Sequence, residues 1–165
     1  MTLPRKRILI LRSCRLAQFL TAVVVARRRN PEAEVVALSH RGHHHELRAA
    51  GVDRVIEIPG RRFGLTSVPP WQLGDLRAGG FDQVIIPQMN ERPDEHVNVY
   101  RFVLSLNPAS VAIIAGEALP REFDRGEFLS YVLQHSTAGI RQFDAAMFAV
   151  LAAGLVERFV TDRLR

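Results

Sequence analysis

Residues 12–18 (RSCRLAQ) hold the first group of side chains with which this chain could bind a ligand. They follow an apolar run and precede a helical pattern. Ser13 and the backbone N–H groups after it would stand at a helix N-terminus, where anions are favoured. The guanidinium groups of Arg12 and Arg15 could hold a carboxylate or a phosphate. The alternative is that both arginines are solvated and that Ser13 only caps the helix.

A second group is the histidine-rich segment at residues 39–46 (SHRGHHHE). Neutral imidazoles bind zinc, copper or nickel, but the ligands on one helix usually stand three or four residues apart. Only His40 with His43 or His44 meets that spacing, and no third ligand is evident. We therefore expect no metal site, and we interpret these histidines as surface residues, with His40 facing a cleft.

The third group is residues 88–92 (QMNER), which follow a predicted strand. The side-chain amides of Gln88 and Asn90 could bind the hydroxyl groups of a sugar or a ribose. A polar exit loop that binds nothing is the alternative.

Signatures of covalent catalysis and of cofactor binding are absent from the sequence. Cys14 is the single cysteine, and without a partner histidine we expect a small buried thiol instead of a nucleophile. Residues 12–18 contain no glycine, so the backbone cannot approach a pyrophosphate as a G-x-G-x-x-G loop does. No Walker A sequence is present. We therefore expect no cofactor and no P-loop ATPase.

Alternating strands and helices would position these segments. Apolar runs predict strands at residues 8–11, 34–38, 54–58, 83–86 and 110–115, and periodicity predicts helices that begin near residues 16, 45, 71 and 95. Several strands are apolar on both faces, which is typical of a parallel sheet covered on both sides. We expect an α/β fold: a single doubly wound, Rossmann-like parallel sheet of about five strands, ordered 3-2-1-4-5.

The spacing of apolar residues also predicts which helix faces are buried. The first helix would bury Leu16, Phe19, Leu20, Val23 and Val24, and would end near Asn30-Pro31. Asp94 would cap the fourth helix. That helix would turn Val97, Tyr100, Val103 and Leu104 inward.

The last part of the chain differs from the rest. We divide the sequence into a Rossmann-like domain at residues 1–125 and a helical C-terminal extension at residues 126–165. Residues 140–164 predict one long helix with an apolar side. We interpret it as packed on the sheet or on a partner, because its polar end carries both signs of charge. An interfacial membrane helix is the alternative.

Composition excludes several classes of protein. With 165 residues, 47% hydrophobic and 24% charged, the chain suits one globular domain. The net charge of +5 is almost all arginine, and residues 27–29 would complement a helix C-terminus. Without an RNA-binding motif we expect no nucleic-acid partner. We find no transmembrane span or signal peptide, and we expect a cytoplasmic protein, with peripheral attachment at the inner membrane face left open.

Three segments in the first two thirds of the chain follow one another in an order that resembles that of a known protein family. They are residues 6–38 (KRILILRSCRLAQFLTAVVVARRRNPEAEVVAL), 49–59 (AAGVDRVIEIP) and 80–90 (GFDQVIIPQMN). Over residues 6–116 this order resembles the N-terminal, acceptor-side domain of the ADP-heptose:lipopolysaccharide heptosyltransferase family. The members of that family are GT-B glycosyltransferases with two facing Rossmann-like domains.

Two departures from the family change what the resemblance implies. The family's Gly-Asp pair, whose carboxylate serves as general base, falls on Ala17-Gln18, and an amide cannot take a proton at neutral pH. His40 is a candidate substitute. We also expect no donor-binding domain in these 165 residues, because about 50 residues after Gly116 are too few to form it.

We therefore expect a pseudoenzyme, inactive alone, that serves as an accessory or acceptor-binding subunit in surface glycan synthesis. Its ligand would be a sugar or a sugar phosphate in a cleft formed by Arg12, Ser13, Arg15, Gln18, His40, Gln88 and Asn90. Its partner would be a donor-domain protein, or a second copy joined through the C-terminal helix. The alternatives are a transferase that is active only with a partner chain, and a non-enzymatic flavodoxin-like interaction module. An open, arginine-lined cleft would favour ligand binding, and a cleft filled by its own side chains would favour the module.

Overall fold

The computed structural model describes residues 5–59, 63–64, 67–90, 92–116 and 119–135. Its strands are β1 (Arg7–Leu11), β2 (Glu34–His40), β3 (Arg54–Ile58), β4 (Gln83–Gln88), β5 (Ser110–Ala115) and β6 (Arg121–Asp124). Its helices are α1 (Leu16–Arg29), α2 (His44–Ala49), α3 (Pro70–Ala78), α4 (Val97–Leu106) and α5 (Arg125–His135), with a 3₁₀ helix η1 (Pro93–His96) before α4.

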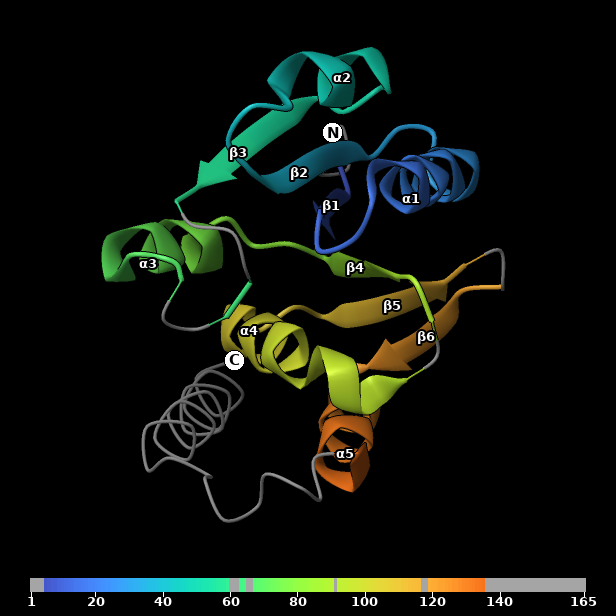
Figure 1. Cartoon of the computed structure of the whole chain (residues 1–165), viewed down its shortest axis with the longest axis vertical. Helices are drawn as coiled ribbons and strands as arrows, with labels where there is room; N and C mark the ends of the chain where they lie inside the picture. Colours follow the sequence, from blue (N-terminus) through green and yellow to red (C-terminus); the bar gives the residue numbers. More distant parts are fainter. Residues whose placement is uncertain (1–4, 60–62, 65–66, 91, 117–118, 136–165) are drawn as a thin grey trace.

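The six strands form one sheet in the order β3-β2-β1-β4-β5-β6 (Figure 1). Strands β1 to β5 are parallel, and Leu9 of β1 stands between Val36 of β2 and Val84 of β4. This confirms the doubly wound, Rossmann-like sheet and its 3-2-1-4-5 order. The sixth strand, β6, pairs antiparallel with β5 at the edge and was not predicted. Its four residues are REFD, which carry no apolar alternation.

Both faces of the sheet are covered, and β1 shows how the sequence achieves this. Successive side chains of a strand point to opposite faces. Ile8 and Ile10 pack in a core with α1 and α2, whereas Leu9 and Leu11 pack in a second core with α3, α4 and α5. A strand buried on both sides must be apolar throughout, which is why the continuous apolar runs identified the strands.

The buried face of α1 agrees with the predicted one except at Val24. Phe19 and Val23 are buried, and Leu16 and Leu20 pack half-buried against the same core. Val24 is 48% exposed, whereas Ala22 and Ala26 are buried as well. The prediction counted only bulky residues, so it missed the two alanines of the buried face.

Two strands continue beyond their predicted ends. Strand β2 extends to His40, so this residue belongs to the strand and not to a loop. Strand β4 passes through Pro87. Proline has no N–H for a ladder, but the ladder between β1 and β4 already ends at Ile85. The Ser13 hydroxyl donates to the Pro87 carbonyl at 3.2 Å, on the side where that ladder has ended.

The chain enters α4 differently from the prediction. Asp94 lies inside η1, and α4 begins three residues later at Val97 without a side-chain cap. The reason is Pro93, which starts a 3₁₀ turn that carries the chain into the helix. Val97 is half-buried, whereas Tyr100, Val103 and Leu104 are buried as predicted. Phe102 and Leu106 are buried as well, because α3 and α5 also pack against α4.

The end of the described chain packs on the same core. Phe128 and Val132 of α5 join the cluster formed by α3, α4 and the sheet. The predicted helix at residues 140–164 lies outside the described residues. Among the described residues, no helix has the length and apolar character needed to cross a membrane.

Asp53 joins three elements at the amino ends of the parallel strands. This end of the sheet is opposite the loops that follow the strands. Its carboxylate accepts hydrogen bonds from the Val35 N–H at the start of β2 and from Arg27 at the end of α1, each at 2.7 Å. Partial burial acts to raise the pKa of Asp53, but these two hydrogen bonds and the charges of Arg27 and Arg5 outweigh it and hold that pKa below 3.8. The carboxylate therefore stabilises the folded chain in its ionised form.

We predict that Asp53→Ala lowers the free energy of unfolding by about 2 kcal/mol, because charged hydrogen-bond partners are lost. The measurement is urea unfolding at pH 7. Because the pKa is lowered on folding, the contribution is present above pH 3.8 and is lost as the pH falls below that value. The control is Asp75→Ala at an exposed residue of α3. Equal loss in both variants, or a difference that persists at pH 2, would contradict this account.

Candidate functional site

A cavity of about 480 Å³ opens at the carboxyl ends of the central strands. It is lined by Arg12, Ser13 and Cys14 after β1, His40 at the end of β2, Phe63, and Glu95, His96, Asn98 and Val99 of η1 and α4. In a doubly wound sheet this edge, where the strand order reverses beside β1, is the usual place of a ligand. The structure thus brings together the first and second of the three predicted segments.

Arg12 enters the cavity from the end of β1. Its backbone N–H donates to the Leu38 carbonyl at 2.9 Å, so the residue is held against β2. The guanidinium Nε is buried and has no hydrogen-bond partner in the described part of the chain. A buried donor without a partner costs free energy, and an acceptor supplied by a ligand would remove that cost.

Ser13 has a structural role that the sequence did not reveal. Its hydroxyl donates to Pro87 of β4, and Arg15, not Ser13, occupies the N-cap position of α1. The alternative in which Ser13 only caps the helix is therefore wrong. The residue instead fastens the loop after β1 to β4, which keeps Arg12 and Cys14 at the cavity.

His40 forms an aromatic wall with Phe63. The centroids of the two rings are 4.8 Å apart. Phe63 in turn packs against Phe102 of α4, with 6.1 Å between the ring centroids. Phe63 is buried and His40 is half-buried. The planes of the two rings are inclined by 50°. One side of the cavity is therefore an angled and largely apolar surface with an imidazole at its rim.

His96, which the sequence analysis missed, faces this wall from η1. Its Nε2 is buried and has no hydrogen-bond partner among the described residues. Burial lowers the pKa of His96, although the carboxylates of Glu95 and Asp94 act in the opposite direction. The imidazole is therefore neutral at pH 7. The position of His96 depends on the 3₁₀ turn that begins at Pro93. The sequence has no periodic pattern of apolar residues that would predict this turn.

Neither Gln88 nor Asn90 is among the described residues that line the cavity. Gln88 is 1% exposed and donates to the Tyr100 hydroxyl at 2.6 Å. Asn90 donates to Glu95 at 2.9 Å and accepts from the Arg92 N–H at 3.1 Å. Both amides are thus used to shape the wall that carries Glu95 and the following helix.

Arg15 and Gln18 stand on the first turn of α1, outside the set of residues that line the cavity. Arg15 is exposed and Gln18 is half-buried. The side-chain oxygen of Gln18 is buried and has no hydrogen-bond partner within the described ranges. The structure therefore separates these two residues from Arg12, Ser13 and His40.

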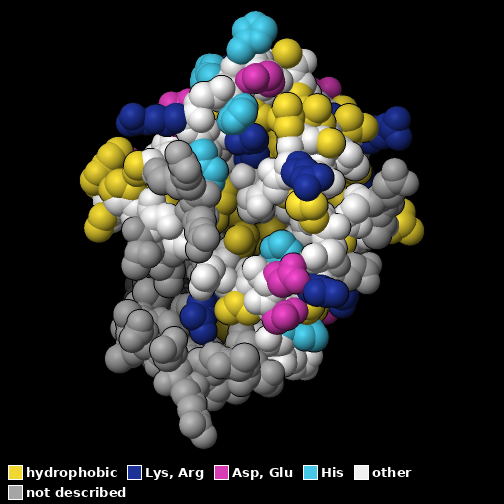
Figure 2. All heavy atoms as spheres, in the orientation of Figure 1, with side chains coloured by type: hydrophobic (Ala, Val, Ile, Leu, Met, Phe, Trp, Pro, Cys, Tyr) yellow, Lys and Arg dark blue, Asp and Glu magenta, His cyan; other side chains and the backbone are white. Residues whose placement is uncertain are grey.

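The histidines do not gather into a metal centre. On the face drawn in Figure 2 they are spread among arginine and acidic side chains. No group of three or more histidine, cysteine, aspartate or glutamate residues within the described ranges could hold a metal ion. The closest approach near α2 is His43 to Glu46, at 3.8 Å.

Comparisons with known proteins add little to this geometry. No family model matches the chain, and no curated protein sequence matches it. One solved structure that aligns with it is S. aureus TarJ in complex with NADPH, with 13% identity and a TM-score of 0.33. The alignment covers 90% of this chain and 45% of that chain, so this chain spans less than half the length of that protein. The heptosyltransferase resemblance stays a prediction.

Cys14 provides a test of the cavity's chemistry. Burial raises the pKa of its thiol from 9.0 to about 11, although the charge of Arg12 and a hydrogen bond from the Phe19 N–H act to lower it. At pH 8 the thiolate fraction would then be about 100-fold below that of an exposed cysteine.

We predict that Cys14 is alkylated by iodoacetamide at pH 8 roughly 100-fold more slowly than free cysteine, because the thiolate is the nucleophile. Since Cys14 is the only cysteine, mass spectrometry of the intact chain follows this one site. Chain unfolded in urea serves as the control and should react at the rate of the free amino acid. Fast alkylation of the folded chain would show an activated thiol and would contradict the prediction.

Proposed function

We propose that this chain binds a phosphorylated sugar in the cavity at the ends of β1 and β2, and that it does not transfer the sugar by itself. The observation that carries the proposal is the buried, unpartnered Nε of Arg12 on the wall of an open cavity. The cavity is open, and Arg12 is the one arginine among its described lining residues. This arrangement supports a ligand-binding domain over an interaction module.

Charge is the first argument for an anionic ligand. An arginine guanidinium remains protonated at any physiological pH and suits the geometry of a phosphate. The nearby imidazole of His96 is neutral and can act as donor or acceptor, depending on its tautomer. Glu95, which also lines the cavity, is already engaged by Asn90 and Arg92. A phosphate would therefore bind at Arg12, away from that carboxylate.

Shape is the argument for a sugar as the rest of the ligand. A volume of about 480 Å³ lies within the usual range for small-molecule pockets. The wall formed by His40 and Phe63 could pack against the apolar face of a sugar ring. Asn98 offers an amide that could bind its hydroxyl groups. These features support a sugar phosphate over a simple anion.

The resemblance to heptosyltransferases supports an acceptor role in surface glycan synthesis. Gln18, at the position of the family's base, cannot accept a proton from an acceptor hydroxyl. His40 lines the cavity and is the one predicted residue there that could do so. We therefore keep a second candidate function, a transferase that works only when a partner chain brings a nucleotide-sugar donor to this edge of the sheet.

We predict that hexose and heptose phosphates raise the Tm of the chain by about 5–10 °C at a hundredfold excess over Kd. Arg12→Met should abolish most of this shift, because the substitution removes the charge and the donors but keeps much of the side-chain length. Arg28→Met is the control, since Arg28 is an exposed residue of α1. The measurement is differential scanning fluorimetry with the chain and both variants.

The ligand panel separates the outcomes. Inorganic phosphate and the unphosphorylated sugars should each produce a much smaller shift than the sugar phosphates. A shift that is equal with phosphate alone would show a general anion site, and a flat response across the panel would favour the interaction module. Sugar transfer to an acceptor by the isolated chain would contradict the proposed inactivity.

A further inference from the structure

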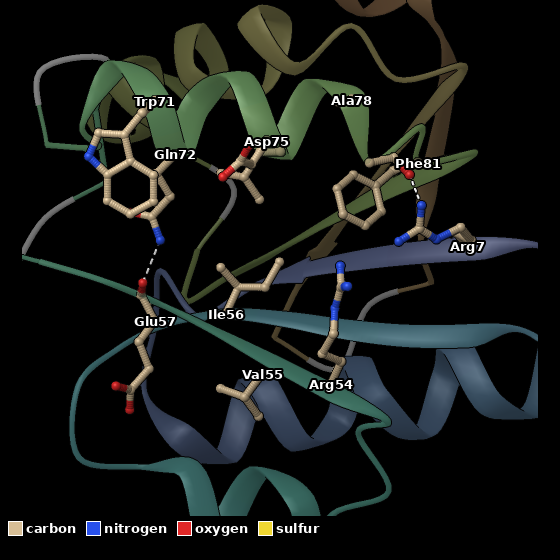
Figure 3. Close-up of a pocket in the computed structure, with 12 residues that line it drawn as sticks. Arg7, Arg54, Val55, Ile56, Glu57, Trp71, Gln72, Asp75, Ala78 and Phe81 are labelled. Atoms are coloured by element: carbon tan, nitrogen blue, oxygen red, sulfur yellow. Dashed lines mark hydrogen bonds between the residues drawn. The ribbon is translucent and has the colours of Figure 1, made fainter.

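A second hollow, of about 530 Å³, lies between the edge strand β3 and helix α3 (Figure 3). We call it the α3 groove, and the side chains that matter in it are Arg54, Ile56, Trp71, Gln72, Asp75 and Phe81. Among the described residues it shares no lining residue with the cavity at the ends of β1 and β2. Any ligand of the α3 groove would therefore bind at a separate site.

One end of the α3 groove is aromatic. Trp71, the single tryptophan of the chain, is 69% exposed, and Figure 3 shows its indole above the Glu57 end of β3. A large ring on the wall of a hollow offers an open surface on which another flat ring can stack. The floor beside it is apolar, with Ile56 half-buried and Leu76 buried.

The other end of the α3 groove is cationic. Figure 3 shows the guanidinium of Arg54 rising from β3 into the hollow, toward Phe81 and Arg7. Arg7 is held in place by Glu34 at 2.9 Å, by the Gly79 carbonyl, and by the Phe81 ring at 5.2 Å from its centroid. Arg54 is exposed and forms no ion pair with a described residue. It is therefore available to an anion.

Between these ends stand groups that accept hydrogen bonds. Gln72 is 8% exposed, and its Nε2 donates to the Glu57 carbonyl at 2.6 Å. This bond fixes the orientation of the amide and leaves its Oε1 buried without a hydrogen-bond partner in the described part of the chain. Asp75 adds an exposed carboxylate on the same helix. A ligand that suits this stretch must bring N–H donors.

We propose that the α3 groove binds a nucleoside phosphate. The base stacks on Trp71 and turns its amino group toward Asp75 and Gln72, and the phosphate binds at Arg54. The repulsion between Asp75 and a phosphate fixes this direction. Arg54 and Glu57 are three residues apart on β3, which corresponds to about 10 Å, and a nucleotide can bridge that span.

The same residues argue against an added β-strand. Strand β3 is the last strand of its side of the sheet, so its outer edge could in principle pair with an extended peptide. The Gln72 side chain, however, already donates a hydrogen bond to the Glu57 carbonyl, which an added strand would need. The hollow also has an aromatic end and a cationic end, which suits a ligand with one ring and one anion better than a repeating backbone.

The single tryptophan makes a direct test possible. Because Trp71 is the only tryptophan, its fluorescence, excited at the red edge of its absorption band, reports on the α3 groove alone. We expect AMP and ADP to quench it saturably and adenosine to bind at least about 10-fold more weakly. Ribose 5-phosphate should cause no quenching, because it lacks the aromatic base that stacks on Trp71. Absence of saturable quenching by AMP and ADP, or equal affinity for adenosine and AMP, would overturn the proposal.

Two variants test where the phosphate and the base of the ligand bind. Arg54→Ala should lower the affinity for AMP to that for adenosine, whereas Arg28→Ala should leave it unchanged. Trp71→Ala, followed by calorimetry, should lower the affinity for AMP about 10-fold, which is typical of a lost base–aromatic stack. Circular dichroism and Tm confirm that each variant is folded. Unchanged affinity in folded Arg54→Ala or Trp71→Ala would overturn the assignment.

One further variant distinguishes ligand binding in the α3 groove from binding in the cavity at the ends of β1 and β2. Arg12→Met should retain the quenching by AMP while losing the shift in Tm with sugar phosphates. Loss of both responses in Arg12→Met, with the fold intact, would show that nucleotides bind at the other cavity and would overturn the proposal for the α3 groove.

Discussion

Burial of strand β1 on both faces is the constraint on which the rest of this structure depends. Residues Ile8 to Leu11 have no exposed surface. Helices must therefore cover both faces of the sheet, and consecutive parallel strands from β1 to β5 must be joined by crossovers. As a result, the segments after β1 and β2 begin at the same end of the sheet, at the carboxyl ends of the strands and beside the start of α4. The cavity with Arg12, His40 and His96 is a consequence of that packing.

The sequence was sufficient to predict the elements that hydrophobic burial specifies. Strands β3 and β5 were predicted with the observed bounds, because each is a short segment rich in valine, isoleucine or alanine that stands between breakers. Strand β6 was missed because its register depends on pairing with β5 and not on its own pattern. At the candidate site, Arg12, Ser13 and His40 were predicted from strand ends, whereas His96 depends on a 3₁₀ turn. The α3 groove was missed too, since it exists only where α3 and β3 meet.

Gln88 shows why residue type alone cannot assign a role at such an edge. An amide after a strand suggested ligand binding, but this amide is buried and donates to Tyr100. Burial raises the pKa of Tyr100 far above its ordinary value, although the bond with Gln88 acts to lower it. The hydroxyl therefore stays protonated. The Gln88–Tyr100 pair ties β4 to α4, and α4 follows directly on His96. Its function is to hold the wall of the cavity.

The arginines divide into two groups once the structure is known, and this division gives the basic charge its meaning. Many of them bond main-chain carbonyls: Arg27 to Gly51 and Ala33, Arg48 to Asp53, and Arg77 to Ser105. These side chains close helix ends and loops, so their charge implies nothing about ligands. Arg12 and Arg54 form no side-chain hydrogen bond with a described residue, and each lines one of the two hollows. The Nε of Arg12 is buried, and a buried donor without a hydrogen bond is costly unless a ligand completes it. Arg54 is exposed and carries no such cost, so its support comes from its place in the α3 groove. These two positions, and not the net charge, support the case for anionic ligands.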